Sequence, residues 1–272
     1  MLPDAKSEWG DADSLGALGV TSGMVSDQVS GGTHTSRTMQ LPGLRVLLAA
    51  VPADAESAQY KDAVIEQNVL GKKTLNSRQR SHRYLRELYG LDPGILLFRA
   101  LRDLWEADAK AQPLLAMLCS LARDPALRAT APAVLPLPQG EAVTADDLAR
   151  ALVDRYPGTY SDAVANKVGR NAASSWTQSG HLAGRAGKTR AHAACGPAAV
   201  AYALLLGRLE GALGEGLFTT FWAQVLDVPR TVVLEQAMTA SQRGWIELRH
   251  GGGVTDITFR LLLRDDHRRP QT

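Results

Sequence analysis

Apolar side chains recur at helical spacing through most of the 272-residue chain, and this pattern predicts a mainly α-helical protein. In the first half, Tyr60 and Val64 lie on one face of a helix that Gly71 ends. Thr74 is placed to cap the next helix, which ends at Gly90. Short connections between such helices are typical of a helical bundle, which we assign to residues 41–131. The helices predicted here cover about residues 56–70, 75–89, 95–105 and 113–121.

A proline-rich stretch divides the chain, and residues 132–143 are predicted to be a linker. Two segments beyond it have β-hairpin patterns: the Gly-punctuated basic stretch after Gly180, and the alternating sequence from Trp245 to Leu261. The helices predicted in this half cover about residues 144–156, 161–178, 197–209, 217–226 and 229–243.

The same order of elements therefore occurs twice, as helix, break, helix, glycine and hairpin. This order is typical of a winged helix, in which a recognition helix enters the major groove and a two-stranded wing lies beside it. The sequence predicts a mainly α fold, with an N-terminal helical bundle followed by two winged-helix-like units with short β-hairpin wings. The two units are assigned to residues 144–210 and 211–262.

The ends of the chain lack periodic apolar positions. Residues 1–40 are rich in Gly, Ser, Thr and Asp, and we expect a disordered acidic tail there, because such a segment buries too little surface to offset its ordering entropy. Residues 41–50 form the first apolar run and are interpreted as a short strand or docking segment. Residues 263–272 are predicted to be a solvated tail.

The helix predicted at 161–178 has two different faces. Val164, Val168, Ala172 and Trp176 fall on one side and are expected to pack inward. The other side is polar, so the helix either reads DNA or is a solvated amphipathic helix beside a surface loop. The candidate DNA-binding residues are Asn166, Lys167, Arg170, Ser174, Thr177 and Gln178 on the helix, and Arg185, Lys188 and Arg190 on the hairpin.

Charge is segregated along the chain, which is typical of proteins with a polyanionic partner. Residues 1–60 carry three bases and seven acids, whereas residues 71–102 carry eight bases and two acids. The alternative for the basic stretch is that long arginine side chains cover apolar surface. The second set of candidate DNA-binding residues comprises Lys72, Lys73, Arg78, Arg80 and Arg83.

The second winged-helix-like unit is a weaker candidate for DNA contact. Its hairpin offers Arg249 and His250, but Glu247 and Asp256 are in the same hairpin. We therefore expect a structural or protein-contacting role for this unit.

Sequence patterns for catalysis are incomplete. The segment from Gly184 to Thr189 resembles a phosphate loop, but Leu182 occupies the position of its first glycine. His181, His192 and Cys195 lack zinc-ligand spacing, and no nucleophile motif is present. We expect no enzymatic activity, cofactor, metal or small-molecule substrate.

Two further features of the sequence concern the cellular compartment of the protein. No secretory signal opens the sequence, so Cys119 and Cys195 are expected to be free thiols in a cytoplasmic protein. The longest apolar run, 198–206, is about half the roughly 20 residues that a bilayer span requires, and no membrane partner is expected.

The segment NVLGKKTLNSRQRSHRYLRELYGLDP (68–93), with RNAASSWTQSGHLAGR (170–185), resembles the BrxA accessory factor family of BREX phage-defence systems. The resemblance covers about residues 56–262 and leaves out the acidic N-terminal segment. It implies winged-helix units, a double-stranded DNA partner, other proteins of a defence system, no enzymatic activity and a bacterial cytoplasm. A free-standing winged-helix transcriptional regulator and a helical scaffold protein are the alternatives.

Overall fold

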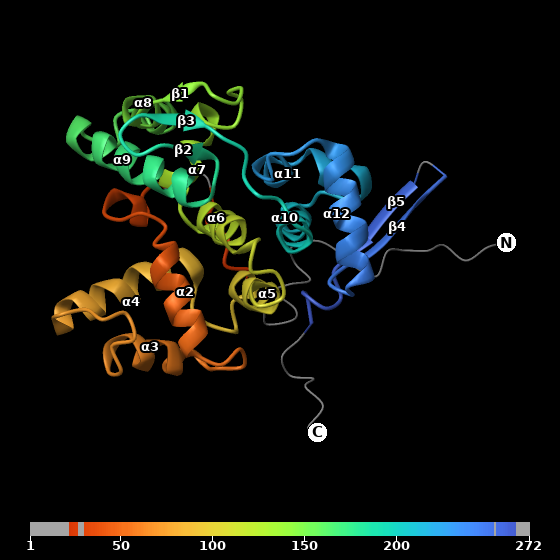
Figure 1. Cartoon of the computed structure of the whole chain (residues 1–272), viewed down its shortest axis with the longest axis horizontal. Coiled ribbons are helices and arrows are strands. Elements are labelled where there is room, and N and C mark those ends of the chain that lie inside the picture. The colour runs from red at the N-terminus through yellow and green to blue at the C-terminus, as the bar shows by residue number, and fades with distance from the viewer. Residues whose placement is uncertain (1–21, 27–29, 253, 265–272) are drawn as a thin grey trace.

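The computed structural model describes residues 22–26, 30–252 and 254–264. The fold is mainly helical with short antiparallel hairpins, as the apolar pattern predicts. In Figure 1, helices α5, α6 and α10 lie at the centre, α2–α4 lie below and to the left, and the two hairpin-bearing units lie at the upper left and the right.

The N-terminal helices are defined by their caps. The Thr74 hydroxyl accepts a hydrogen bond from Ser77 N at 3.2 Å, and Gly90, with φ 93°, ends the same helix. Residues 41–50 form a helix and not the expected strand or docking segment, because Leu41, Leu44 and Leu48 recur at helical spacing and are buried. The bounds are α2 Leu41–Ala50, α3 Ser57–Ile65, α4 Leu75–Tyr89 and α5 Leu96–Trp105.

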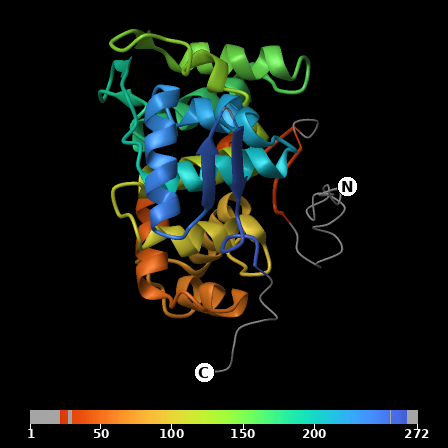
Figure 2. The same cartoon turned by 90° about the vertical axis from the view of Figure 1, so that its right-hand side faces the viewer.

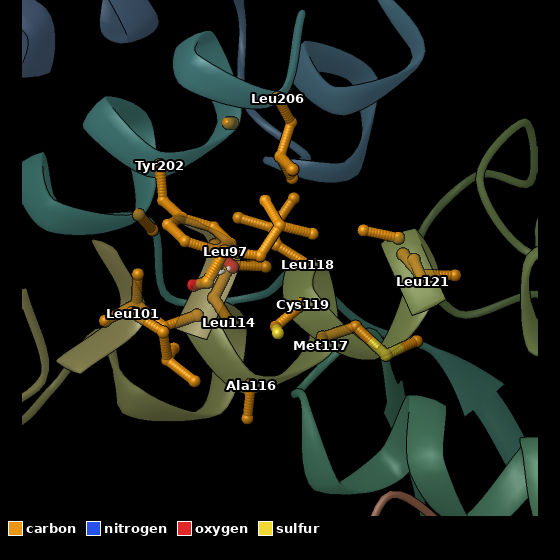
Figure 3. Packing of buried hydrophobic residues seen from close by; sticks show 14 of the residues in the cluster. Leu97, Leu101, Leu114, Ala116, Met117, Leu118, Cys119, Leu121, Tyr202 and Leu206 are labelled. Carbon is orange, nitrogen blue, oxygen red and sulfur yellow. Dashed lines mark hydrogen bonds between the residues drawn. The ribbon is translucent and has the colours of Figure 1, made fainter. Parts of the chain in front are cut away.

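The centre of the core is formed by α5, α6 (Gln112–Arg123) and α10 (Pro197–Leu209), and Figure 3 shows their side chains meeting. Leu101 of α5, Leu118 of α6 and Leu206 of α10 are fully buried. The Tyr202 hydroxyl donates to Leu97 O at 2.9 Å, which satisfies the one polar atom of that side chain. One hydrophobic cluster runs from Met39 to Leu262, so the bundle and both units share a core.

The stretch predicted to be a linker belongs to the first winged-helix unit. Val134 is fully buried, and Ala142 and Val143 pair with Thr189 and Lys188. The strands form an antiparallel sheet in the order β1-β3-β2, with α8 and α9 between β1 and β2, which is a winged-helix topology. The bounds are α7 Pro125–Arg128, η2 Ala131–Ala133, β1 Ala142–Val143, α8 Ala145–Arg155, α9 Asp162–Gln178, β2 Leu182–Ala183 and β3 Lys188–Arg190.

The second winged-helix unit begins earlier than residue 211, because α10 packs against α11 and α12. The helix predicted at 217–226 is divided into a 3-10 helix and α11, and Thr220 caps α11 through a bond from Ala223 N. The β4–β5 hairpin, confirmed where the alternation predicted it, lies beside α12 in Figure 2. The bounds are η3 Gly214–Thr219, α11 Phe221–Val225, α12 Arg230–Gln242, β4 Glu247–Gly251 and β5 Val254–Thr258.

Part of the predicted N-terminal tail is ordered, which corrects that expectation for residues 30–40. This segment contains the 3-10 helix η1 (Thr33–Thr35) and packs against α4, α7 and α9. His34 and Met39 are fully buried within it. Residues 1–21, 27–29 and 265–272, which include most of both predicted tails, lie outside the described residues.

Candidate nucleic-acid interface

Helix α9 is held against α8 by its apolar stripe, as its spacing predicts. Val168, Ala172 and Trp176 are fully buried, and Trp176 Nε1 donates to the Thr130 hydroxyl at 2.9 Å. Gly169 allows the two helices to approach closely, because a Cβ atom there would lie 2.1 Å from Ala145 O. The packing therefore fixes which side of α9 faces solvent.

The N-terminal half of α9 presents the polar residues that the helical phase predicts. Asn166, Lys167 and Arg170 are exposed, and no ion pair within the described part of the chain involves Lys167 or Arg170. Exposed cations that form no ion pair are available to contact phosphate.

The C-terminal half of α9 is less accessible than predicted. Ser174, Thr177 and Gln178 are half-buried. The Thr177 hydroxyl donates to Ala173 O at 2.8 Å, and Gln178 Oε1 accepts from Leu41 N at 3.1 Å. The start of α2 covers this end of the helix, so we restrict the candidate reading face to the N-terminal half.

The wing places its three predicted bases in different environments. Arg185 is exposed in the turn between β2 and β3, and half-buried Lys188 donates from Nζ to Gly184 O at 3.3 Å. Arg190 is only 2% exposed and forms a two-bond ion pair with Asp227, at 2.9 Å from Nη1 and 2.5 Å from Nη2. Arg190 is therefore removed from the candidate DNA-binding residues.

A second contact beside Arg190 joins the two winged-helix units. His181 is fully buried; its Nε2 donates to Val225 O at 2.9 Å and its Nδ1 accepts from the Ser179 hydroxyl at 2.8 Å. Burial, with a smaller effect of the charge on Arg190, lowers the pKa of His181 to about 4. The pKa of Asp227 is also lowered: burial alone would raise it, but the bonds and charge of Arg190 outweigh that effect.

The second predicted set of bases lies on α4 and the loop before it. Lys72, Lys73, Arg80 and Arg83 are exposed. Arg78 is half-buried, and its guanidinium donates to Ile65 O at 3.0 Å, so it closes the connection between α3 and α4. Four of the five residues are thus available to a ligand.

The structure brings together one polar cluster that sequence reasoning missed. His34 Nδ1 is 2.8 Å from Asp124 Oδ2, and His34 Nε2 is 2.7 Å from Ser175 Oγ. The arrangement resembles a Ser-His-Asp triad, but all three side chains are buried and Ser175 Oγ also accepts from Met39 N at 2.9 Å. We interpret the cluster as a structural lock, since a nucleophile needs access to substrate. The partners lie 90 and 141 positions from His34, and no local pattern connects them.

The second unit exposes a mixed surface. On α12, Glu235 and Met238 face solvent. On the hairpin, Glu247 and Asp256 lie beside Arg249, and the Val254 side chain is 68% exposed. This surface lacks the basic excess of the first unit.

Across the described ranges, groups of three or more His, Cys, Asp or Glu side chains that could hold a metal ion are absent. Within those same ranges, the helices are too short or too polar to cross a membrane. No protein-family model matches the chain, and no characterised protein is significantly similar to it.

Proposed function

We propose that this protein binds double-stranded DNA without catalysing a reaction, as a component of a bacterial, cytoplasmic phage-defence system of the BREX type. The observation that carries the DNA-binding proposal is the winged-helix topology of residues 131–190 with exposed, unpaired bases on α9 and its wing. The defence context, with its protein partners, is supported by the resemblance of residues 68–93 and 170–185 to the BrxA family.

The geometry supports a division of roles among the exposed residues. The N-terminal half of α9 enters the major groove, where Asn166 can bond base edges and Lys167 and Arg170 can bond phosphate oxygens. Arg185 in the wing contacts the adjacent backbone. Because most of these contacts are to phosphate, binding has little sequence preference and a steep dependence on salt.

Fluorescence anisotropy with a labelled duplex tests the proposal. Three phosphate contacts correspond to a salt slope of about 2.7, so we expect affinity to fall about fortyfold between roughly 50 and 200 mM salt. Arg170→Ala with Arg185→Ala removes about two phosphate contacts and reduces the salt slope by about 1.8. The matched control is Arg243→Ala with Arg249→Ala, two exposed bases of the second unit. Wild-type protein that fails to bind duplex at low salt contradicts the proposal.

The defence role has its own test, which does not depend on the purified protein. A host that carries the complete defence system loses phage resistance when this gene is deleted, and the wild-type gene restores resistance. The Arg170→Ala, Arg185→Ala variant does not restore it at equal expression. Full resistance in the deletion strain contradicts the defence role and leaves DNA binding intact.

A further inference from the structure

Residues 30–37, here called the bridge, connect the basic regions of α4 and α9, which are far apart in the sequence. Gly31 N donates to the Tyr160 hydroxyl at 2.6 Å, just before α9 begins. The Thr33 hydroxyl donates to Glu87 Oε2 of α4 at 2.7 Å. In Figure 1 this bridge lies between α9 and α4, and it contacts both.

Helical phase places Lys167 of α9 next to the bridge and Arg170 on the neighbouring exposed face. Asn171 Nδ2 donates to His34 O at 2.9 Å, so Asn171 marks the side of α9 that faces the bridge. Lys167 lies one turn before Asn171 on the same side, and it is exposed, so its cation lies along the edge where α9 meets the bridge. Arg170 lies about 100° further round the helix, on the exposed face beside that edge.

Helix α4 also carries two bases on the side that faces the bridge. Glu87 marks the side of α4 that faces the bridge, because it accepts from Thr33. Arg83 and Arg80 lie one and two turns before Glu87 on that side, and both are exposed. Arg83 Nε is 3.6 Å from Glu87 in an exposed pair, which leaves Arg80 as the fully available cation.

Arg37 extends the positive charge across the bridge itself. It is exposed, its guanidinium lies 5.7 Å from the centre of the Tyr84 ring, and that of Arg83 lies 4.8 Å from the same ring. Burial alone would raise the pKa of Tyr84, but the hydrogen bonds of Arg83 and Ser36 and the charges of Arg83 and Arg37 hold it below its ordinary value. A groove of about 500 Å³ lined by Thr35, Ser36, Arg83 and Tyr84 runs beside it.

We propose that Arg37, Arg80, Arg83, Lys167 and Arg170 form one continuous surface, the α4–α9 surface, that binds a single DNA duplex. This proposal rests on the proposed function and extends it. Helix α9 occupies the major groove of the DNA, while Arg37 and the α4 arginines bind the phosphate backbone on one side of that groove. Five cations with Glu87 and Asp162 as the nearby exposed acids form an excess that a duplex, with one charge per about 1.7 Å, neutralises well.

The bridge is rigid, and this matters for affinity. His34 is fixed to Asp124 and Ser175 by three hydrogen bonds, two from its ring and one from its backbone N at 2.9 Å. Gly32, with φ 125°, allows the bridge to pass close to Asp124, because a Cβ atom would lie 2.1 Å from its carboxylate. Arg37 therefore extends from an ordered backbone, which lowers the entropy that binding must overcome.

Duplex binding and hydroxyl-radical footprinting of charge-reversal variants test the α4–α9 surface. Arg37→Glu is expected to lower affinity for a 24-base-pair duplex by about ten- to hundredfold, since a charged hydrogen bond is lost and repulsion replaces it. In Arg37→Glu, the stretch of DNA that the protein protects from hydroxyl radicals shortens at one end only. Arg80→Glu with Arg83→Glu shortens the protected DNA at the same end. Lys110→Glu, at an exposed lysine between α5 and α6, is the control and leaves both readouts unchanged. Arg37→Gln, which removes the charge with the smallest risk to folding, gives a smaller change in the same direction.

The possible outcomes separate the two proposals. If duplex binding depends on Arg170 while Arg37 and α4 variants behave like Lys110→Glu, the α4–α9 surface is refuted and DNA binding by α9 stands. If the wild-type protein binds no duplex, the proposed function is contradicted, and the α4–α9 surface with it. If Arg37→Glu weakens binding to vesicles of anionic phospholipid, and the protein prefers these vesicles to duplex, the surface belongs to a membrane and the assignment to DNA is overturned.

Discussion

The two winged-helix units place similar elements in the same order but present different side chains to solvent. The first unit has a three-stranded sheet and a 17-residue helix whose exposed N-terminal half carries Lys167 and Arg170. The second has a two-stranded hairpin and a 13-residue helix that exposes Glu235 and Met238. The backbone arrangement therefore does not decide what a unit binds, and the exposed residues do.

The comparison also shows how the units depend on each other. Arg190 and His181 of the first unit bond Asp227 and Val225 of the second. These contacts lie at the base of the first wing, so the second unit stabilises the position of that wing. We infer a supporting role for the second unit, and three changes test the contrast between the units.

The largest effect is expected in the helix that anchors the first unit. Trp176→Ala should lower the free energy of unfolding by about 3–5 kcal/mol, because it leaves a cavity and removes the bond to Thr130. The matched change in the second unit, Trp245→Ala, should cost about 1 kcal/mol, since Trp245 is half-buried and stacks on Arg243. Urea titration followed by circular dichroism measures both, and equal losses would contradict the assigned packing.

The next effect is a dependence of stability on pH. His181 has a pKa of about 4 in the folded protein and an ordinary value of 6.5 when unfolded, so the unfolded state binds the proton more readily. Stability is complete above pH 6.5 and falls as the pH drops from 6.5 to 4, by up to about 3 kcal/mol. The pKa of Asp227 is also lowered in the folded protein, so stability falls further when the pH drops below the ordinary pKa of an aspartate.

His181→Gln supplies the control for the pH effect. A glutamine amide can still donate to Val225 O but does not titrate, so the variant should lose the slope between pH 6.5 and 4. Stability is measured as the midpoint of urea unfolding at each pH. A variant that keeps the wild-type slope would show that another group causes it.

The smallest of the three effects concerns the ion pair at the base of the wing. Asp227→Asn should cost about 2 kcal/mol, because the amide keeps one oxygen acceptor for the Arg190 guanidinium but loses one charged hydrogen bond to it. Asparagine tolerates the left-handed backbone of this position, where φ is 61°, so the change does not strain the backbone. Amide hydrogen exchange should become faster in residues 182–190 and stay the same in the β4–β5 hairpin. Unchanged exchange in the first wing would contradict its dependence on the second unit.

Local patterns predicted the elements that carry the candidate site. Gly180, with φ 92°, ends α9 close to where the sequence stops being periodic, and the Thr144–Asp147 capping box begins α8. The stripe through Val168 and Trp176 gave the correct buried side. These features depend on neighbours within one or two turns, which a single sequence contains. Contact of the opposite face with DNA stays a prediction.

Two of the incorrect expectations share a physical cause, since each depended on a distant partner. Arg190 looked like a surface base until Asp227, 37 residues later, was placed beside it. Residues 30–40 are polar enough to seem disordered, yet their bonds to Asp124 and Ser175 order them. Residues 41–50 are a different case: Leu41, Leu44 and Leu48 already had helical spacing, and that signal could have identified α2.

The bridge has a consequence for the order of events during synthesis. His34 leaves the ribosome early, but Ser175 follows 141 residues later, which at about 5–20 residues per second is a delay of roughly 7–28 s. Throughout that interval the His34 imidazole lacks its hydrogen bond to Ser175. The first turn of α2, which follows in the sequence, is not yet covered by α9. Leu41 and Leu44 of the nascent chain therefore stay accessible during this interval, and exposed apolar side chains of this kind are what chaperones bind. Slowing translation between residues 41 and 175 should lengthen that wait, and ribosome-bound chains stalled before Ser175 should be more sensitive to protease near residue 37 than chains stalled well beyond Gln178.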